Sequence, residues 1–239
     1  MDLNGKIALV VGGAGGIGLG IAKALAAEGC RVAVADCSRE ALQKAMSEGK
    51  MLGRVCDVTD RKQVAELFEW LGREVGSLDI LVNSAGINVG NRMMANVDPA
   101  DFDRVMAVNT TGTFNCIHAA LPIMREKRAG LIVNIVSLAG LRVMLLAGMP
   151  YCVSKFATGA LGTFVNLEEA ANGIKVTNIY PGETNTPIVD KRPSPPPPEK
   201  RAQMLQPEDI AACVVAVAKL PPRAVVPELV ITPPHMMVG

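Results

Sequence analysis

The sequence predicts an α/β protein in which a doubly wound parallel sheet carries helices on both faces. Short continuous apolar runs of strand length recur along the 239 residues, and such runs are typical of strands buried on both faces. Stretches of helical periodicity separate these runs. Alternation of strand and helix is the pattern of right-handed crossovers in a parallel sheet.

About seven strands are predicted, at residues 7–11, 31–35, 51–56, 78–82, 131–136, 174–179 and 224–231. Helical patterns cover residues 16–28, 60–75, 100–127, 151–171 and 207–219. Asp98-Pro99 and Gln206-Pro207 each place a proline in the first turn of a helix, and a further helix begins near Ser38. We expect a single domain over residues 1–239 that binds its ligands at the carboxyl ends of the strands.

A proline-rich segment lies within residues 187–206. Pro193 and the run Pro195 to Pro198 do not suit a helix interior or a central strand, so we predict an exposed, extended stretch over residues 187–199. We interpret this region as a short substrate loop within the domain. An inert connector is the equally supported alternative.

Composition excludes several classes of partner. Lys and Arg number 24 against 23 Asp and Glu, which leaves no basic surface for a nucleic acid or an anionic membrane. No apolar stretch approaches the roughly 20 residues of a membrane-spanning helix, and the N-terminus lacks the pattern of a secretion signal. We therefore expect a cytoplasmic protein with no nucleic acid and no membrane as partner.

The six cysteines are expected to be reduced structural thiols. They contain no Cys-x-x-Cys pair, and only His118 and His235 could join them as soft metal ligands. The sequence therefore predicts no metal site.

A glycine-rich turn follows the first predicted strand and opens directly into the first helix. Its glycines allow a tight turn and let a pyrophosphate approach the backbone, while the helix N-terminus supplies N–H donors. This context predicts dinucleotide binding and a Rossmann fold. Two registers fit the turn: Gly13-x-Gly15-x-x-Gly18, the general fingerprint, and Gly12-x-x-x-Gly16-Ile17-Gly18, a wider spacing.

Asp36 ends the second predicted strand about 20 residues after the turn, where an acidic side chain would bind the adenosine ribose. Its charge would repel a 2′-phosphate, so NAD is favoured over NADP. Two alternatives remain open. Asp36 could cap the helix that begins near Ser38, and Arg39 could pair with the 2′-phosphate of NADP.

Tyr151 and Lys155 lie four residues apart at a helix start, on one helical face. An ordinary tyrosine pKa of about 10 is too high for a base near neutrality, and an adjacent cation lowers it by stabilising the phenolate. Alone, such a spacing usually marks a surface pair. As a catalytic device, it predicts that Lys155 lowers the pKa of Tyr151.

Several motifs in chain order now make the sequence resemble a classical short-chain dehydrogenase/reductase over nearly its whole length. The resemblance rests on the turn Gly12-x-x-x-Gly16-Ile17-Gly18, Asp57-Val58, Asn83-Ser84-Ala85-Gly86, Val108-Asn109, Ser137, Tyr151 with Lys155, and Pro181-Gly182.

The resemblance implies four catalytic residues. Tyr151 would exchange a proton with the substrate oxygen, and Ser137 would orient that oxygen by a hydrogen bond. Lys155 would lower the tyrosine pKa and hold the nicotinamide ribose, and Asn109 would anchor a water that resupplies protons. The implied cofactor-binding residues are Gly12, Gly15, Gly16, Ile17, Gly18, Asp36, Asp57, Val58, Asn83, Ala85, Gly86, Tyr151, Lys155, Pro181, Gly182, Thr184 and Thr186.

The sequence departs from the family pattern at Val11, Ser84 and Thr184, where the family often has Thr, Asn and an aliphatic residue. Thr186 resembles the family's carboxamide-binding threonine, with a turn hydroxyl as the alternative. The interval 138–150 is one residue longer than the commonest spacing and is expected to reshape the pocket wall. Seven apolar side chains of this interval could line the pocket of a mainly apolar substrate, and ordinary core or a subunit contact is the equal alternative: Leu138, Leu141, Val143, Met144, Leu145, Leu146 and Met149. Arg142 is available for an anionic group.

The predicted function is an NAD-dependent oxidoreductase that interconverts a secondary alcohol and a ketone, with tyrosine as general acid/base. One alternative is an NADPH-dependent 3-oxoacyl thioester reductase, and another is a non-catalytic nucleotide-binding sensor or scaffold. The resemblance also implies a homo-oligomer, a tetramer or dimer built on the helices near residues 100–127 and 151–171.

Overall fold

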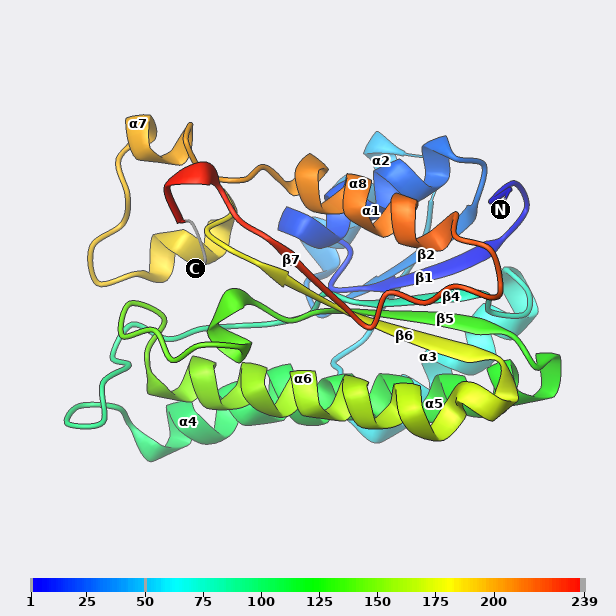
Figure 1. Ribbon diagram of the computed structural model, residues 1–239, viewed down its shortest axis with the longest axis horizontal. Coiled ribbons are helices and arrows are strands. Elements are labelled where there is room, and N and C mark those ends of the chain that lie inside the picture. The colour runs from blue at the N-terminus through cyan, green and yellow to red at the C-terminus, as the bar shows by residue number, and fades with distance from the viewer. Residues whose placement is uncertain (1, 50, 237–239) are drawn as a thin grey trace.

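The computed structural model describes residues 2–49 and 51–236; Met1, Lys50 and residues 237–239, parts of the predicted domain 1–239, lie outside the described residues. Within the described ranges, seven parallel strands form one sheet in the order β3-β2-β1-β4-β5-β6-β7 (Figure 1). The strands are β1 (Ile7–Val11), β2 (Arg31–Asp36), β3 (Leu52–Val55), β4 (Ile80–Asn83), β5 (Gly130–Ile135), β6 (Ile174–Pro181) and β7 (Glu228–Ile231). The predicted doubly wound Rossmann sheet is confirmed.

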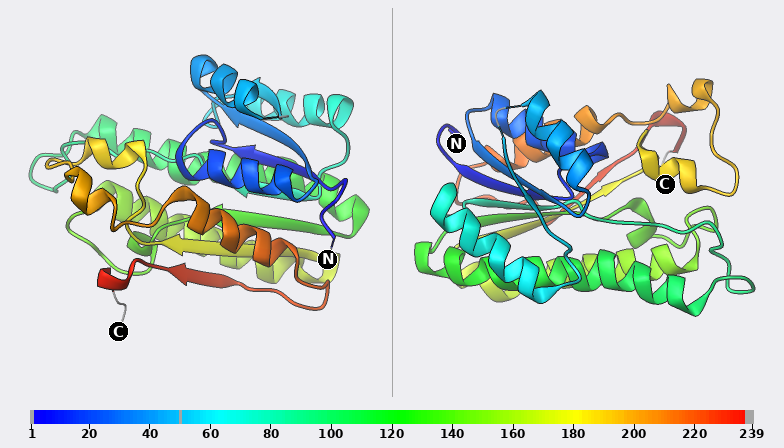
Figure 2. Two further views of the ribbon diagram at one scale, coloured as in Figure 1. Left: turned by 90° about the horizontal axis from the view of Figure 1, so that it is seen from above. Right: turned by 180° about the vertical axis from the view of Figure 1, so that it is seen from behind.

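Helices cover both faces of the sheet (Figures 1 and 2). One face carries α1 (Gly16–Ala27), α2 (Arg39–Glu48) and α8 (Pro207–Ala218), and the other carries α3 (Arg61–Glu74), α4 (Pro99–Met106), α5 (Gly112–Lys127) and α6 (Met149–Glu169). Each layer buries a separate apolar cluster against the sheet. Side-chain caps fix several helix starts: Asp60 accepts N–H groups at the start of α3, and Asp98 does so before Pro99 in α4.

Three predicted elements differ from the structure. The helix predicted over residues 100–127 is divided by a π-helical turn, Ala107–Thr111, because one extra residue enters the helix there. The strand predicted over residues 224–231 is confined to β7, and Pro227, which has no N–H to donate, directly precedes it. The extended stretch predicted over residues 187–199 is wrong at both ends, since a 3₁₀ helix spans Pro187–Lys191 and α7 spans Pro198–Arg201. A proline is well tolerated in a first turn, where its missing N–H would have no helical partner.

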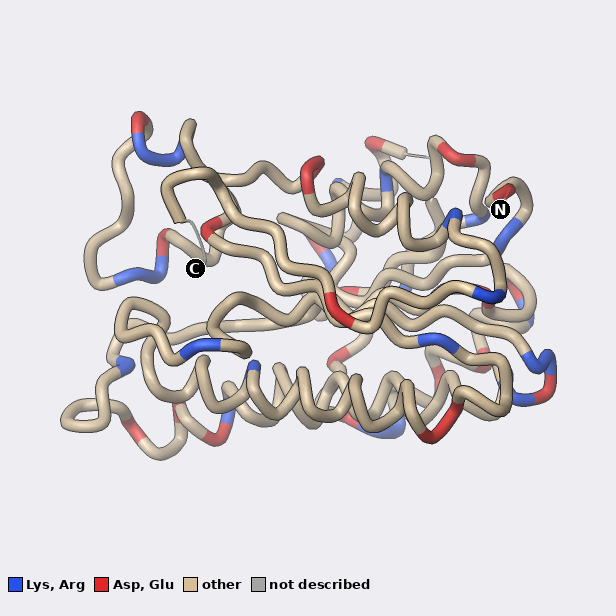
Figure 3. Tube along the Cα trace, viewed as in Figure 1, with Lys and Arg blue, Asp and Glu red and all other residues tan. Residues whose placement is uncertain are grey.

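Charged residues of both signs are interspersed over the two helical layers (Figure 3). In the part of the chain that the structure describes, no helix combines the length and apolar character needed to cross a membrane.

Three asparagines on neighbouring strands form a buried row, which we call the asparagine row: Asn83 on β4, Asn134 on β5 and Asn178 on β6. They lie opposite one another in the strand register. Nδ2 of Asn83 donates to Oδ1 of Asn134 at 2.9 Å, and Nδ2 of Asn134 donates to Oδ1 of Asn178 at 3.0 Å. Nδ2 of Asn178 in turn donates to the carbonyl oxygen of Gly159 in α6 at 2.9 Å. The row therefore connects the centre of the sheet to the helix that bears Tyr151.

Candidate active site

A cavity of about 710 Å³ lies at the carboxyl ends of the strands, where the parallel topology predicts a ligand site. Residues that follow β1, β2, β4, β5 and β6 line it, so segments far apart in the sequence converge there. The predicted site residues that line the cavity are Gly12, Gly15, Gly16, Ile17, Asp36, Asp57, Val58, Ala85, Gly86, Ser137, Tyr151, Lys155, Pro181, Gly182, Thr184 and Thr186.

Three predicted site residues are not part of this lining. A Cβ at Gly18 would collide with the carbonyl oxygen of Gly12, so Gly18 allows α1 to pack closely on the turn. Asn83 belongs to the asparagine row. Asn109 is buried behind the lining, against Ile87 and Ser154.

The glycine turn is shaped to receive a phosphate. Gly12 has a φ of +73°, in the left-handed region that favours glycine, and its N–H donates to the carbonyl oxygen of Ala35 at 2.8 Å. Gly15 directly precedes α1 and has open space where a Cβ would stand. An anion there would face the N–H groups and the positive dipole end of a 12-residue helix. The residues present therefore fit the pyrophosphate of a dinucleotide.

Asp36 lies at the end of β2 on the cavity wall. Its Oδ2 accepts the N–H of Ala14 at 3.3 Å, and its Oδ1 accepts the N–H of Ser38 at 3.0 Å. The cap of α2 is Ser38 itself, whose Oγ accepts the N–H of Ala41. Asp36 therefore ties the glycine turn to the strand end, and Arg39 lies exposed beyond it.

Ser137, Tyr151 and Lys155 come together from two elements. Ser137 follows β5, while Tyr151 and Lys155 occupy successive turns at the start of α6. The hydroxyls of Ser137 and Tyr151 are hydrogen-bonded to each other. Nζ of Lys155 donates to the carbonyl oxygen of Ile135 at 2.9 Å and lies 5.5 Å from the centroid of the Tyr151 ring.

The pKa of Tyr151 differs from the prediction. Burial raises the pKa of Tyr151 to about 12, and the hydrogen bond with Ser137 lowers it only in part. Burial likewise lowers the pKa of Lys155 to about 8. Contrary to the prediction, burial sets the tyrosine pKa, and Lys155, whose ammonium lies over the ring, is not among the groups that shift it.

Asn109 sits in the π-helical turn and clamps the loop after β4 onto α6. Its Oδ1 accepts the N–H of Ile87 at 2.8 Å, and its Nδ2 donates to the carbonyl oxygen of Ile87 and to Oγ of Ser154, both at 3.0 Å. Its backbone oxygen accepts the hydroxyls of Thr113 and Thr158. Sequence reasoning missed Ser154, although its place within Tyr-x-x-x-Lys was a usable signal.

The rest of the cavity is walled mainly by apolar side chains. Leu138, Met144 and Leu146 of the predicted set line it, whereas Val143 and Leu145 are 78% and 75% exposed. Leu141, Met149 and Arg142 are not part of the lining either. Further apolar side chains come from beyond β6, at Ile188, Val189 and Met236.

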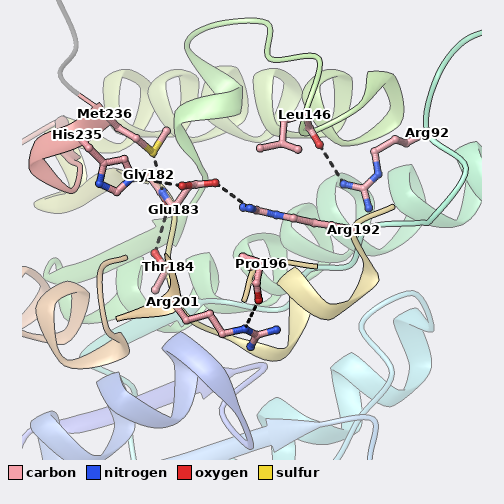
Figure 4. A network of polar contacts seen from close by, with 10 residues as sticks. All are labelled: Arg92, Leu146, Gly182, Glu183, Thr184, Arg192, Pro196, Arg201, His235 and Met236. Atoms are coloured by element: carbon pink, nitrogen blue, oxygen red, sulfur yellow. Dashed lines mark hydrogen bonds and ion pairs between the residues drawn. The ribbon is translucent and has the colours of Figure 1, made fainter. Parts of the chain in front are cut away.

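Four charged residues of the cavity lining were missed: Arg92, Arg104, Glu183 and Arg192. Figure 4 shows Arg92, Glu183 and Arg192. Arg92 lies in the loop after β4, and Glu183 directly follows Pro181-Gly182. Their places after predicted strand ends were the available signal, but no motif marks them.

Comparison with known proteins places these features in a family. Residues 6–196 match the family model described as short chain dehydrogenase. The chain is 35% identical over 241 residues to glycine betaine reductase ATRR of Emericella nidulans; the match covers 97% of this chain and 19% of that longer protein. It is 34% identical over 202 residues to the 3-oxoacyl-(acyl-carrier-protein) reductase FabG of Thermotoga maritima, covering 81% of this chain and 80% of the relative. A solved structure described as the closed form of serine dehydrogenase complexed with NADP⁺ superposes with a TM-score of 0.90 at 27% identity, covering 97% and 96% of the two chains.

Proposed function

Because the chain belongs to the short-chain dehydrogenase/reductase family and is an NAD(P)-dependent oxidoreductase acting on CH–OH groups, we propose that it interconverts a secondary alcohol and a ketone with NAD as cofactor. One observation carries this proposal: the hydrogen-bonded hydroxyls of Ser137 and Tyr151 line the cavity beside Lys155. The nicotinamide supplies or accepts the hydride when it is bound. The chain's own residues position the substrate and move the proton.

Tyr151 is the proposed general acid/base. With a pKa of about 12, its phenol is protonated at neutral pH and can donate its proton to a carbonyl oxygen as the hydride reaches the carbon. In the reverse direction the phenolate accepts the proton of the alcohol. Ser137 orients the same oxygen, Lys155 holds the ribose, and Asn109 supports the route by which protons return.

The preference for NAD rests on Asp36. Its carboxylate stands on the cavity wall within reach of the glycine turn, where it would accept ribose hydroxyls and repel a 2′-phosphate. The alternative is an NADPH-dependent reductase of 3-oxoacyl thioesters, in line with what the Thermotoga maritima relative is named for. The exposed Arg39 would then serve the phosphate. The serine dehydrogenase structure contains NADP⁺, so the choice needs a direct measurement.

We further propose that residues 187–206 form part of the substrate pocket, because Ile188, Val189 and Arg192 line the cavity.

A homo-oligomer through α5 and α6 is proposed because apolar side chains are exposed there, including Phe164 at 65% and Leu167 at 74% exposed. Light scattering measures the oligomeric state directly.

The six cysteines are free thiols, which suits the proposed cytoplasmic location.

The test of the proposed function is a kinetic screen of secondary alcohols and ketones with NAD(H) and with NADP(H), following nicotinamide absorbance. Tyr151→Phe should lose about 10²- to 10⁴-fold in kcat while it retains nucleotide affinity. Tyr180→Phe is the matched control, because Tyr180 is the other tyrosine of the sequence and its hydroxyl contacts Glu228 outside the cavity. Equal turnover by wild type and Tyr151→Phe would refute the proposal, and a strong NADPH preference would refute the role of Asp36.

A further inference from the structure

Arg92 is a buried cation whose hydrogen-bond partners carry no negative charge. Arg92 is only 4% exposed to solvent. Nε donates to the carbonyl oxygen of Gly90 at 3.4 Å, Nη1 to that of Leu146 at 3.1 Å and Nη2 to that of Lys191 at 2.6 Å. Buried arginines are usually paired with a carboxylate. Among the described residues, no carboxylate contacts Arg92.

A second cation adds to the effect of burial on Arg92. Burial lowers the pKa of Arg92, and the charge of Arg192 lowers it further. Arg192 itself pairs with Glu183, with Nη1 2.8 Å from Oε1, and the other oxygen of Glu183 lies 3.5 Å from Nε2 of His235 (Figure 4). Glu183 therefore balances the charge of Arg192, while Arg92 has only backbone carbonyls as partners, which leaves this corner of the cavity with positive charge.

Both arginines line the same cavity as Ser137 and Tyr151. The backbone oxygen of Arg92 accepts the N–H of Met149, two residues before Tyr151, so Arg92 is anchored to the helix start that bears the tyrosine. A guanidinium has five N–H groups, and three of those on Arg92 donate to the carbonyls named above. One N–H on each of Nη1 and Nη2 remains, a pair suited to the two oxygens of a carboxylate.

We propose that the substrate carries a carboxylate, which binds between Arg92 and Arg192 while the carbon that bears its hydroxyl lies at Tyr151. The substrate class is then a secondary hydroxy acid and the matching keto acid, with an apolar body against side chains such as Met144 and Ile188. This inference rests on the proposed function for its chemistry. The competing explanation is that Arg92 only fastens three backbone segments together.

The test compares each acid with its own neutral methyl ester. The substrates are aliphatic hydroxy acids whose secondary hydroxyl lies one to three carbons from the carboxylate. For at least one chain length, wild type should show a kcat/KM about tenfold or more higher for the acid than for the ester. Arg92→Met and Arg192→Met should each remove most of this preference. Because the acid-to-ester ratio is measured within one variant, a loss of folded protein cancels.

Arg128→Met is the matched control. Arg128 lies at the end of α5, donates like Arg92 to a backbone carbonyl, that of Ala171, and does not line the cavity. Its acid-to-ester ratio should equal that of wild type. A wild-type ratio near one, or a ratio that both Arg92→Met and Arg192→Met leave intact, would overturn the carboxylate site and support a purely structural Arg92.

A binding arm separates this inference from the proposed function. Hexanoate and hexanamide are titrated into the protein by calorimetry, without turnover. Hexanoate should bind more tightly than hexanamide in wild type, and Arg92→Met and Arg192→Met should abolish the difference. If no alcohol is oxidised but this difference holds, the proposed function fails and the anion site stands. If alcohols are oxidised but hexanoate binds no better than hexanamide, the anion site fails alone.

Discussion

Nζ of Lys155 lies 5.5 Å from the centroid of the Tyr151 ring, and its hydrogen bond goes to the carbonyl oxygen of Ile135. The ammonium is thus held over the phenol ring, with its hydrogen bond directed to the backbone. In the protein alone, burial decides the protonation state of both groups, so that the tyrosine keeps its proton and the lysine loses its own more readily.

The two tyrosines should therefore resist ionisation. Burial raises the pKa of both Tyr151 and Tyr180 to about 12, above the ordinary value of about 10. A spectrophotometric titration of the nucleotide-free protein should show no tyrosinate absorbance at pH 10, and Tyr151→Phe should halve the change seen at higher pH. A signal near pH 9 that disappears in Tyr151→Phe would contradict the burial argument.

Replacing Asp36 should change the nucleotide preference. Asp36→Ser removes a negative charge from the cavity wall, which should weaken NAD binding and relieve repulsion of a 2′-phosphate. We expect the Kd ratio of NADP to NAD to fall by about tenfold or more, as measured by fluorescence titration. Asp60→Asn is the control, because Asp60 caps α3 outside the cavity and its substitution should leave the ratio unchanged.

Gly162 in α6 should tolerate no side chain. A Cβ there would collide with Oδ1 of Asn178 and lie 2.6 Å from Nδ2 of Asn134. Gly162→Ala should lower the free energy of unfolding by about 1–3 kcal/mol in chemical denaturation. Gly72→Ala in α3 provides the opposite case, since a Cβ at Gly72 would meet nothing within 4 Å and should stabilise the helix by about 0.5–1 kcal/mol. If the two substitutions changed the free energy of unfolding by the same amount, the asparagine row would have to accommodate a side chain at residue 162 without loss of stability.

The pair of Arg125 and Glu169 should make stability depend on pH. Hydrogen bonds from Arg125 lower the pKa of Glu169, whose side chain is 1% exposed. A carboxyl with a lowered pKa in the folded state stabilises the fold above its ordinary value of 4.5, and this contribution is lost as the pH falls through the lowered pKa. Arg125→Met should therefore lower the Tm at pH 7, with a smaller difference from wild type at pH 3. Lys23→Met, which breaks an exposed pair with Glu48, should change the Tm less, and a larger change there would contradict the role given to burial.

Features set by local spacing could be predicted from the sequence. The glycine turn, Asp36 and the Tyr151–Lys155 pair each depend on neighbours within a few residues and on their place after a strand. Arg92 could not be predicted in its role, because two of its three carbonyl partners lie 54 and 99 residues away along the chain. The raised pKa of Tyr151 was likewise out of reach, since it depends on solvent exclusion by segments that meet only in the folded protein.

The asparagine row also selects how the central strands align. β4, β5 and β6 are rich in Ile, Leu and Val, and aliphatic contacts of this kind would be satisfied nearly as well if one strand slipped by two residues. Such a slip would set Asn134 opposite Val176 or Tyr180 and leave buried amides without partners, at a cost of about 1–3 kcal/mol for each unpaired group. It would also carry Ser137 about 6.6 Å along the sheet, away from the phenol of Tyr151. Three side chains outside the cavity lining thus fix the register of the central strands, and with it the spacing between the hydroxyls of Ser137 and Tyr151.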